Sequence, residues 1–300
     1  MGSQDCEFLQ RQNPGSFKKL TALSLDMGHS APIGVFDSGI GGLSVVRHIR
    51  ARLPHENLVY FADSQYNPYG DKPEPFIVER SFKITDFLLS QGAKALVVAC
   101  NTATAAAIHL LRAHYKDLPI VGVEPGLKPA SFKTMSSIVG VMATARTLTS
   151  HKFHVLHHLL SEQSGVHFIL QPCPGLADLI EREDPDSEEV VQCIRTYLLP
   201  LLEQRADTIV LGCTHYPFVQ HIIERLAAEA GHPDLMVIDT GGAIARQLEH
   251  VLQDHGLLCK GTPETAPADF QIFTSGDAGK TRNIVKRLLS MDVPVRQALF

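Results

Sequence analysis

The segment QGAKALVVACNT at residues 91–102 decides how this chain folds. Its apolar run at 95–99 predicts a short buried strand, and helical spacing begins just after the polar triplet Cys100-Asn101-Thr102. A similar segment, QRADTIVLGCTH, stands at residues 204–215, which places Cys213 113 residues after Cys100. This repeat predicts one cysteine in each of two α/β halves, with chance similarity between two buried strands as the alternative.

Short apolar runs alternate with helical patterns along the rest of the chain from residue 31. The apolar runs predict strands at 33–36, 58–62, 95–99, 119–123, 137–142, 166–170, 208–211, 235–238 and 269–274. The helical spacings predict helices at 43–49, 76–89, 103–114, 150–160, 187–204, 217–230, 243–253 and 280–290. This alternation indicates an α/β protein whose parallel strands are buried on both faces.

Polar and reactive side chains follow the predicted strands. They are Asp37-Ser38, Asp63, Cys100-Asn101-Thr102, Glu124, Thr144, Cys213-Thr214-His215 and Asp239-Thr240. In parallel sheets, the loops after the carboxyl ends of the strands form the binding crevice. We therefore expect the functional site where these loops meet.

Composition and charge exclude several classes of protein. Of the 300 residues, 44% are hydrophobic and 20% are charged, which is typical of a globular chain and unlike a disordered one. The formal net charge of −5 gives no reason to expect a nucleic-acid partner. No apolar run reaches the ~20 residues of a membrane span, and the apolar stretch at 20–25 is too short for a signal peptide. We expect a cytoplasmic protein with no membrane partner.

The cysteines need separate explanations, because no pair of them forms a CxxC motif. In a cytoplasm they are expected to be reduced. Cys6, Cys173, Cys193 and Cys259 are interpreted as small buried hydrophobes. The same interpretation stays open for Cys100 and Cys213. A metal site at Cys213 and His215 is disfavoured because the sequence lacks clustered ligands, so no metal is predicted.

Two thiols at helix starts offer a specific chemistry. A helix N-terminus carries free N–H groups and a partial positive charge, so it can favour a thiolate and hold a substrate carboxylate. Two such thiols on opposite sides of a carbon can remove a proton from one face and deliver one to the other. That exchange inverts a stereocentre and accounts for two similar sites.

The sequence resembles the glutamate racemases, cofactor-independent enzymes that supply D-glutamate for peptidoglycan and so serve cell-wall biogenesis and cell shape. The matching segments are VFDSGIGGLSV at 35–45, NPYG at 67–70, VVACNTA at 97–103, GVEP at 122–125, GVMAT at 140–144, LGCTHYP at 211–217 and DTG at 239–241. They extend over most of the chain, and the two cysteine motifs together set this family apart from most α/β enzymes.

The resemblance implies two similar flavodoxin-like three-layer domains with a substrate cleft between them. It implies a first domain of residues 31–122 plus 237–300, a second of residues 123–236, and an N-terminal extension of residues 1–30. By the same resemblance, Cys100 is the base for D-glutamate and Cys213 the base for L-glutamate. Asp37 and His215 are their polar helpers, and Glu181 lies near the second thiol. The implied substrate shell is Asp37, Ser38, Tyr69, Gly70, Asn101, Thr102, Thr144, Thr214 and His215.

The family also implies partners. The substrate is glutamate, no cofactor is needed, and the enzyme is a homodimer. Some members with N-terminal extensions need a cell-wall precursor, a UDP-muramyl compound, as an activator.

Other functions stay open. The first is an aspartate or hydantoin racemase with the same two thiols, and the second is a non-catalytic small-molecule binding protein. The third is a pyridoxal phosphate racemase, which needs a Schiff-base lysine in the pocket, and the nearest candidate is Lys128.

Overall fold

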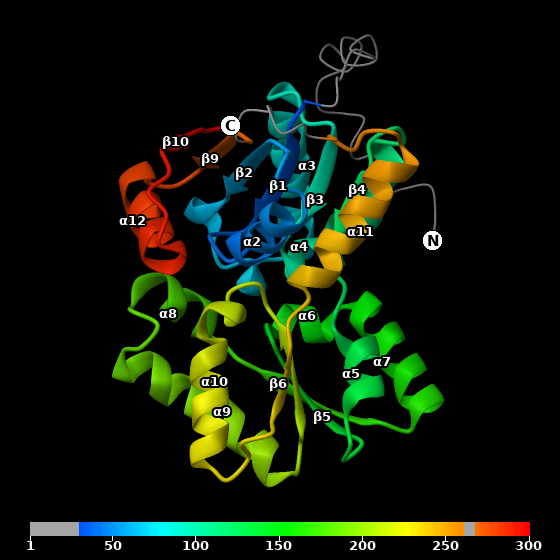
Figure 1. Ribbon diagram of the computed structural model, residues 1–300, viewed down its shortest axis with the longest axis vertical. Coiled ribbons are helices and arrows are strands. Elements are labelled where there is room, and N and C mark those ends of the chain that lie inside the picture. The colour runs from blue at the N-terminus through cyan, green and yellow to red at the C-terminus, as the bar shows by residue number, and fades with distance from the viewer. Residues whose placement is uncertain (1–29, 261–267) are drawn as a thin grey trace.

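The protein has two domains, one above the other in Figure 1, and each is built on a sheet of parallel strands. The computed structural model describes residues 30–260 and 268–300. The first sheet has the order β10-β9-β2-β1-β3-β4 and the second has the order β6-β5-β7-β8. The first contains β1 (Ile33–Asp37), β2 (Leu58–Ala62), β3 (Ala95–Val98), β4 (Ile120–Gly122), β9 (Phe270–Thr274) and β10 (Val295–Gln297). The second contains β5 (Ile138–Ala143), β6 (His167–Pro172), β7 (Thr208–Gly212) and β8 (Met236–Ile238). The α/β prediction is confirmed.

Four adjacent strands of the first sheet, in the order β2-β1-β3-β4, share one topology with the whole second sheet. In each case, the first strand of the unit pairs with the second on one side and with the third on the other, and the fourth lies beyond the third. This is the start of a flavodoxin-like order. The two copies of the repeat found in the sequence are the third strands, β3 and β7, so Cys100 and Cys213 follow equivalent strands.

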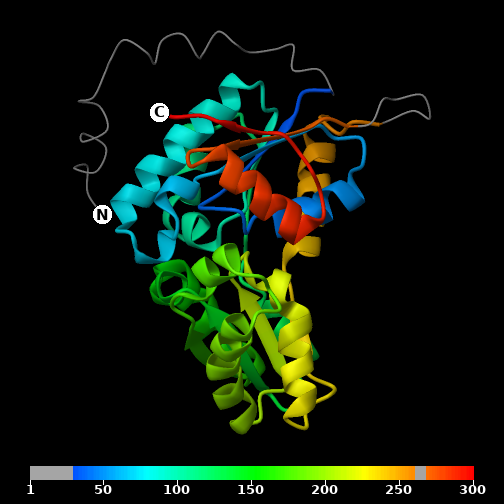
Figure 2. The same cartoon turned by 90° about the vertical axis from the view of Figure 1, so that its left-hand side faces the viewer.

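Helices cover both faces of each sheet, and this arrangement explains why the strands are apolar throughout. The helices are α2 (Leu43–Arg52), α3 (Glu74–Ser90), α4 (Asn101–His114), α5 (Leu127–Lys133), α6 (Ala145–Thr149), α7 (His151–Ser164), α8 (Leu176–Arg182), α9 (Glu188–Glu203), α10 (Gln220–Glu229), α11 (Gly241–Asp254) and α12 (Ala278–Leu289). In the first domain α2 and α11 share one apolar cluster with the sheet, while α3 and α4 share another on the opposite face. In the second domain α9 and α10 pack on one face and α5 and α7 on the other. Both domains therefore have three layers (Figure 2).

The chain passes between the domains twice. It leaves the first sheet after β4 and returns after β8, directly into α11. The boundary expected after residue 236 falls inside β8, which pairs with β7 through Ile238. Residues 1–29 of the expected N-terminal extension lie outside the described residues.

The carboxyl ends of the central strands meet between the domains. The residues that follow β1, β3, β5 and β7 all line one pocket there. No helix in the described ranges is long and apolar enough to cross a membrane.

Candidate active site

A pocket lies between the domains, with a volume of about 300 Å³ that includes open solvent at its mouth. The segment between β2 and α3 and the start of α8 complete its wall. The lining residues are Ser38, Asn67, Pro68, Tyr69, Gly70, Cys100, Asn101, Thr102, Thr144, Ala177, Gly212, Cys213, Thr214 and His215. Both thiols thus open into the same small space. Of the predicted site residues, Asp37 and Glu181 lie outside this lining, in the protein behind it.

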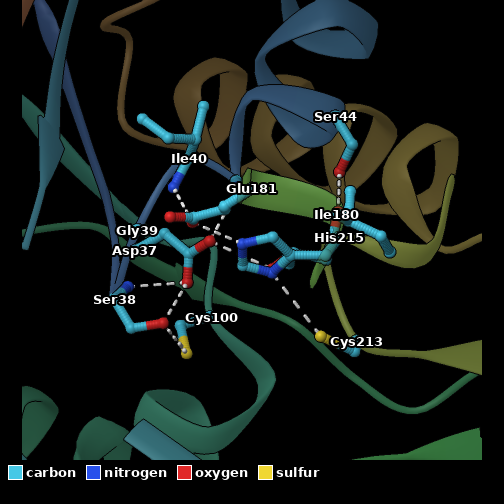
Figure 3. Close-up of polar contacts among 12 residues, drawn as sticks. Asp37, Ser38, Gly39, Ile40, Ser44, Cys100, Ile180, Glu181, Cys213 and His215 are labelled. Atoms are coloured by element: carbon cyan, nitrogen blue, oxygen red, sulfur yellow. Dashed lines mark hydrogen bonds and ion pairs between the residues drawn. The ribbon is translucent and has the colours of Figure 1, made fainter. Parts of the chain in front are cut away.

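Cys100 stands between β3 and α4 as the N-cap of the helix. Its backbone is extended, and its Sγ accepts a hydrogen bond from the N–H of Ala103 at 3.4 Å. The same sulfur lies 3.8 Å from the Oγ of Ser38, in the loop after β1 (Figure 3). Two equivalent loops of neighbouring strands therefore fix this thiol.

The start of α4 lowers the pKa of Cys100, as a helix N-terminus can, but other effects outweigh it. Burial and the negative charge of Asp37 raise the pKa of this thiol well above its usual range, and the N–H of Ala103 offsets only part of the effect. Cys100 therefore favours its protonated form before substrate binds. As a thiol, it is suited to donate a proton.

Asp37 ends β1 and is fully buried. Its carboxylate accepts hydrogen bonds from the N–H of Ser38 at 2.7 Å and of Gly42 at 2.5 Å. From the other domain, the hydroxyl of Thr214 donates to it at 3.0 Å. Burial raises the pKa of Asp37, while the charge of His215 and these hydrogen bonds counteract the rise. Asp37 therefore connects the two thiol loops.

Cys213, His215 and Glu181 form a chain of contacts on the other side of the pocket (Figure 3). The Sγ of Cys213 lies 3.7 Å from Nδ1 of His215. The opposite ring nitrogen, Nε2, lies 2.6 Å from Oε1 of Glu181. That carboxylate oxygen also accepts a hydrogen bond from the N–H of Ile40 at 2.9 Å.

The buried pair is charged. Burial alone lowers the pKa of His215, but the hydrogen bonds and charges of Cys213 and Glu181 raise it well above its usual range. Burial raises the pKa of Glu181, but the hydrogen bond and charge of His215 bring it below the ordinary value. The charged imidazole carries a proton on each ring nitrogen, so Nε2–H faces Glu181 and Nδ1–H faces the sulfur of Cys213. His215 can therefore stabilise Cys213 as a thiolate, and Glu181 stabilises the imidazolium.

Polar atoms that can bind a ligand line the rest of the pocket. The hydroxyls of Thr102 and Thr144 lie 3.2 Å apart across the domain boundary. Asn67 Oδ1 and Asn101 Nδ2 are buried with no hydrogen-bond partner among the described residues. Helix α4 begins at Asn101, so its free N–H groups point to the same space. An anionic ligand would meet N–H and hydroxyl donors here.

Sequence reasoning missed several residues that shape the site. Asn67 lies in the quoted NPYG segment but was not assigned to the substrate shell, and Ala177 carried no signal at all. Ile40 and Gly41 lie in the glycine-rich loop at 37–42, which contacts Glu181 and packs closely against His215. A Cβ on Gly41 would stand 2.4 Å from Nδ1 of His215, so the loop must contain glycine there.

Neither a metal site nor a Schiff-base lysine is found in the described part of the chain. It contains no group of three or more His, Cys, Asp or Glu side chains arranged to hold a metal ion. None of the lining residues is a lysine. Cys173 is buried in an apolar cluster, and Cys193 packs against the same cluster. Cys259 lies outside the lining, and Cys6 is outside the described residues.

Comparisons with known proteins agree on one family. The Asp/Glu/Hydantoin racemase family matches residues 43–248. The chain is 50% identical over 251 residues to a glutamate racemase of Methylococcus capsulatus, covering 84% of this chain and 89% of the relative. The crystal structure of glutamate racemase isoform RacE1 from Bacillus anthracis is 31% identical with a TM-score of 0.78, covering 90% of this chain and 98% of that one. An Escherichia coli glutamate racemase in complex with L-glutamate and the activator UDP-MurNAc-ala is 30% identical with a TM-score of 0.75, with the same coverage.

Proposed function

The chain belongs to the Asp/Glu/Hydantoin racemase family and is an amino-acid racemase, and from this premise we propose that it interconverts L- and D-glutamate with two cysteine thiols and no cofactor. One observation carries the mechanism. Cys100 and Cys213 follow equivalent strands of two similar domains and line the same pocket. A substrate between them presents one face of its α-carbon to each sulfur.

In the L-to-D direction, Cys213 is the base. The charged His215 stabilises its thiolate, which removes the α-proton of L-glutamate. Cys100, held as a thiol by burial and by Asp37, then delivers its proton to the opposite face. The α-carbon gains as many protons as it loses, and the configuration is inverted.

In the D-to-L direction, the roles are exchanged. Cys100 must first lose its proton, and we assign Asp37 as the acceptor, because the charge of its carboxylate acts on this thiol. The buried carboxylate has a raised pKa, so it is a stronger base than an exposed aspartate. The thiol of Cys213 then donates to the carbanion.

Glutamate suits the pocket because its two carboxylates need donors. The N-terminus of α4, the unpaired amide of Asn101 and the hydroxyls of Thr102 and Thr144 supply them. We place Ser38, Tyr69, Gly70, Thr214 and His215 in the same substrate shell, because they line the pocket.

The biological role and the assembly are part of the proposal. We propose that the D-glutamate product enters peptidoglycan synthesis in the cytoplasm and that the enzyme works as a homodimer. The E. coli relative was crystallised with UDP-MurNAc-ala as an activator, so the same compound is the effector to test on this chain.

Circular dichroism of L- and of D-glutamate, followed with no cofactor added, tests the proposal. Wild type should racemise both enantiomers, while Cys100→Ser and Cys213→Ser should lose this activity and keep their fold. Wild-type inactivity, persisting with UDP-MurNAc-ala added, would refute glutamate as the substrate, and activity on aspartate would then support the related racemase. Full activity of both variants would make the cysteines packing residues and overturn the two-thiol mechanism.

A further inference from the structure

Arg287 links the two domains directly behind the candidate active site. It lies in the last turn of α12, a helix of the first domain, and it is partly buried. Its guanidinium donates hydrogen bonds to the main-chain oxygens of Ile180 at 3.3 Å and Arg182 at 3.2 Å, and also to that of Glu181. These three residues end α8 in the second domain (Figure 1).

The end of α8 needs such a partner. The last carbonyl groups of an α-helix have no N–H donor within the helix, and they carry a partial negative charge. In α8 the N–H of Glu183 bonds to the carbonyl of Leu179 and leaves the next three carbonyls without a helical donor. Arg287 donates to all three, and its positive charge is favourable at this end of a helix.

The same end of α8 carries the carboxylate that contacts His215. Glu181 is fixed through its side chain by Ile40 and His215, and through its main chain by Arg287. Helix α8 has only seven residues, too few to be stable without tertiary contacts. The position of the Glu181 carboxylate therefore depends on what holds the helix end.

We propose that Arg287 is a positioning residue for racemisation: by clamping the C-terminal end of α8 from the opposite domain, it sets Glu181 against His215. The proposal rests on the two-thiol mechanism proposed above. Because α12 and α8 belong to different domains, the clamp also ties the geometry of the proton relay to the arrangement of the two domains.

A displaced Glu181 should change proton transfer more than substrate binding. Glu181 does not line the pocket, so KM should stay within about threefold of wild type. A shift of about 1 Å in a catalytic group can cost ~100-fold in rate, so Arg287→Ala should lower kcat by about 10- to 100-fold. A fall in kcat with little change in KM distinguishes a positioning role from general instability of the fold.

The pH profile of kcat gives a second readout. The groups that face His215 are Cys213 on its own loop, Glu181 on α8 and Asp37 at the end of β1. Glu181 contributes to the raised pKa of His215, and so its withdrawal makes the imidazolium lose its proton at lower pH. The alkaline limb of kcat should therefore move to lower pH in Arg287→Ala.

The experiment compares full-length variants in one racemisation assay. Arg287→Ala is measured alone and combined with Glu181→Gln, and Arg287→Lys keeps the charge but loses the planar fork. Arg282→Ala is the matched control, since Arg282 stands on the same helix but pairs with Asp292 at the surface. If Arg287 acts through Glu181, its loss should cost little further kcat, at most about twofold, in the Glu181→Gln background. Arg287→Lys should fall between wild type and Arg287→Ala.

Three results would overturn the clamp while leaving the two-thiol mechanism intact. These are an unchanged kcat and pH limb in folded Arg287→Ala, a kcat loss that simply multiplies with that of Glu181→Gln, and an equal loss in the Arg282→Ala control. If Arg287→Ala does not fold, the test passes to Arg287→Lys, whose wild-type kcat and pH limb would equally refute the proposal. Failure of the proposed function itself is visible separately, as a wild-type enzyme without activity or as active cysteine variants.

Discussion

Cys100 and Cys213 end equivalent strands, yet their neighbours differ. The carboxylate of Asp37 adds negative charge beside the first sulfur, whereas the second faces the imidazole of His215. The sequence repeat is thus chemically asymmetric. In the proposed mechanism, Cys100 starts as a proton donor and the charged His215 stabilises Cys213 as a thiolate, so this state is ready for the L-to-D direction.

The proton on Cys100 can be followed by the ultraviolet absorbance of its thiolate. In a Cys213→Ser background, Asp37→Asn removes the nearby charge, so the pKa of Cys100 should fall and its titration should move to lower pH by about 1 or more. The Cys100→Ser, Cys213→Ser double variant supplies the baseline of the other cysteines. An unmoved titration would mean that burial alone holds the proton.

Gly41 determines whether His215 reaches its position beside the sulfur. A Cβ there would lie 2.4 Å from Nδ1 of the ring and 2.6 Å from Oγ1 of Thr214, so Gly41→Ala must displace one or both. We expect kcat to fall by about 100-fold and stability by ~1–3 kcal/mol. Racemisation rates and urea unfolding measure the two effects. In the control Gly242→Ala, the nearest atom to the added Cβ is Nη1 of Arg246 at 3.6 Å, an ordinary contact, and near-wild-type behaviour is expected.

At the scale of elements, the sequence pattern predicted the long helices with an apolar stripe and the strands with an apolar run. The nine predicted strands all exist, with ends shifted by at most two residues. Helices α5, α6 and α8 and strand β10 escaped prediction. Each has seven residues or fewer, so periodicity has too little length to be seen.

The candidate site divides in the same way. Residues at the ends of long strands were predictable, because parallel strands bring their carboxyl ends to one edge. The contact between Arg287 and α8 was not predictable, because it joins residues more than a hundred positions apart through main-chain oxygens. No pattern in the sequence marks such a partner. The pKa of Cys100 could not be predicted either, because the burial of the thiol raises it more than the start of the helix lowers it.

The loop between β2 and α3 depends on a buried ion pair. Asp63 binds Arg80 through two hydrogen bonds at 2.9 and 2.7 Å and accepts another from the hydroxyl of Tyr69 at 2.5 Å. Tyr69 belongs to the pocket lining. The pair therefore anchors one wall of the site from behind.

Two substitutions should separate the ion pair from its hydroxyl partner. Arg80→Ala leaves a buried carboxylate unpaired and should destabilise the fold by ~3–5 kcal/mol. Tyr69→Phe removes one hydrogen bond while the pair remains, so a loss of about 1–2 kcal/mol is expected. Urea unfolding measures both losses. Equal destabilisation by both would contradict the assigned order.

Across the whole molecule, polar contacts beside the site join the two domains. The hydroxyl of Ser44 donates to the main-chain oxygen of Thr214 at 2.8 Å, and the N–H of Ile40 binds Glu181. These contacts lie beside or behind both thiol loops (Figure 3). Any rotation of one domain against the other therefore changes the surroundings of the thiols and the relay together.

His48 and Asp239 hold the point where the chain returns to the first domain. Nε2 of His48, on α2, lies 3.0 Å from Oδ2 of Asp239, just after β8. The other oxygen of the carboxylate accepts a hydrogen bond from the N–H of Gly241 at 3.0 Å, at the start of α11. Burial raises the pKa of Asp239, but the hydrogen bonds from His48 and Gly241 bring it below the ordinary value.

This lowered pKa makes the crossing sensitive to acid. Because the folded-state pKa of Asp239 lies below the unfolded value of ~3.9, its contribution to stability is present above that pH and is lost as the pH falls through the folded-state pKa. Asp239→Asn should therefore cost about 1 kcal/mol at neutral pH, after screening of this partly exposed pair. Its deficit should shrink below about pH 4, where wild type loses the same charge. Urea unfolding of both proteins across that range measures the difference, and Asp292→Asn, which breaks only an exposed pair, is the control. A deficit that stayed constant with pH would show that the carboxylate acts at the crossing through its shape and hydrogen bonds and that its charge contributes nothing.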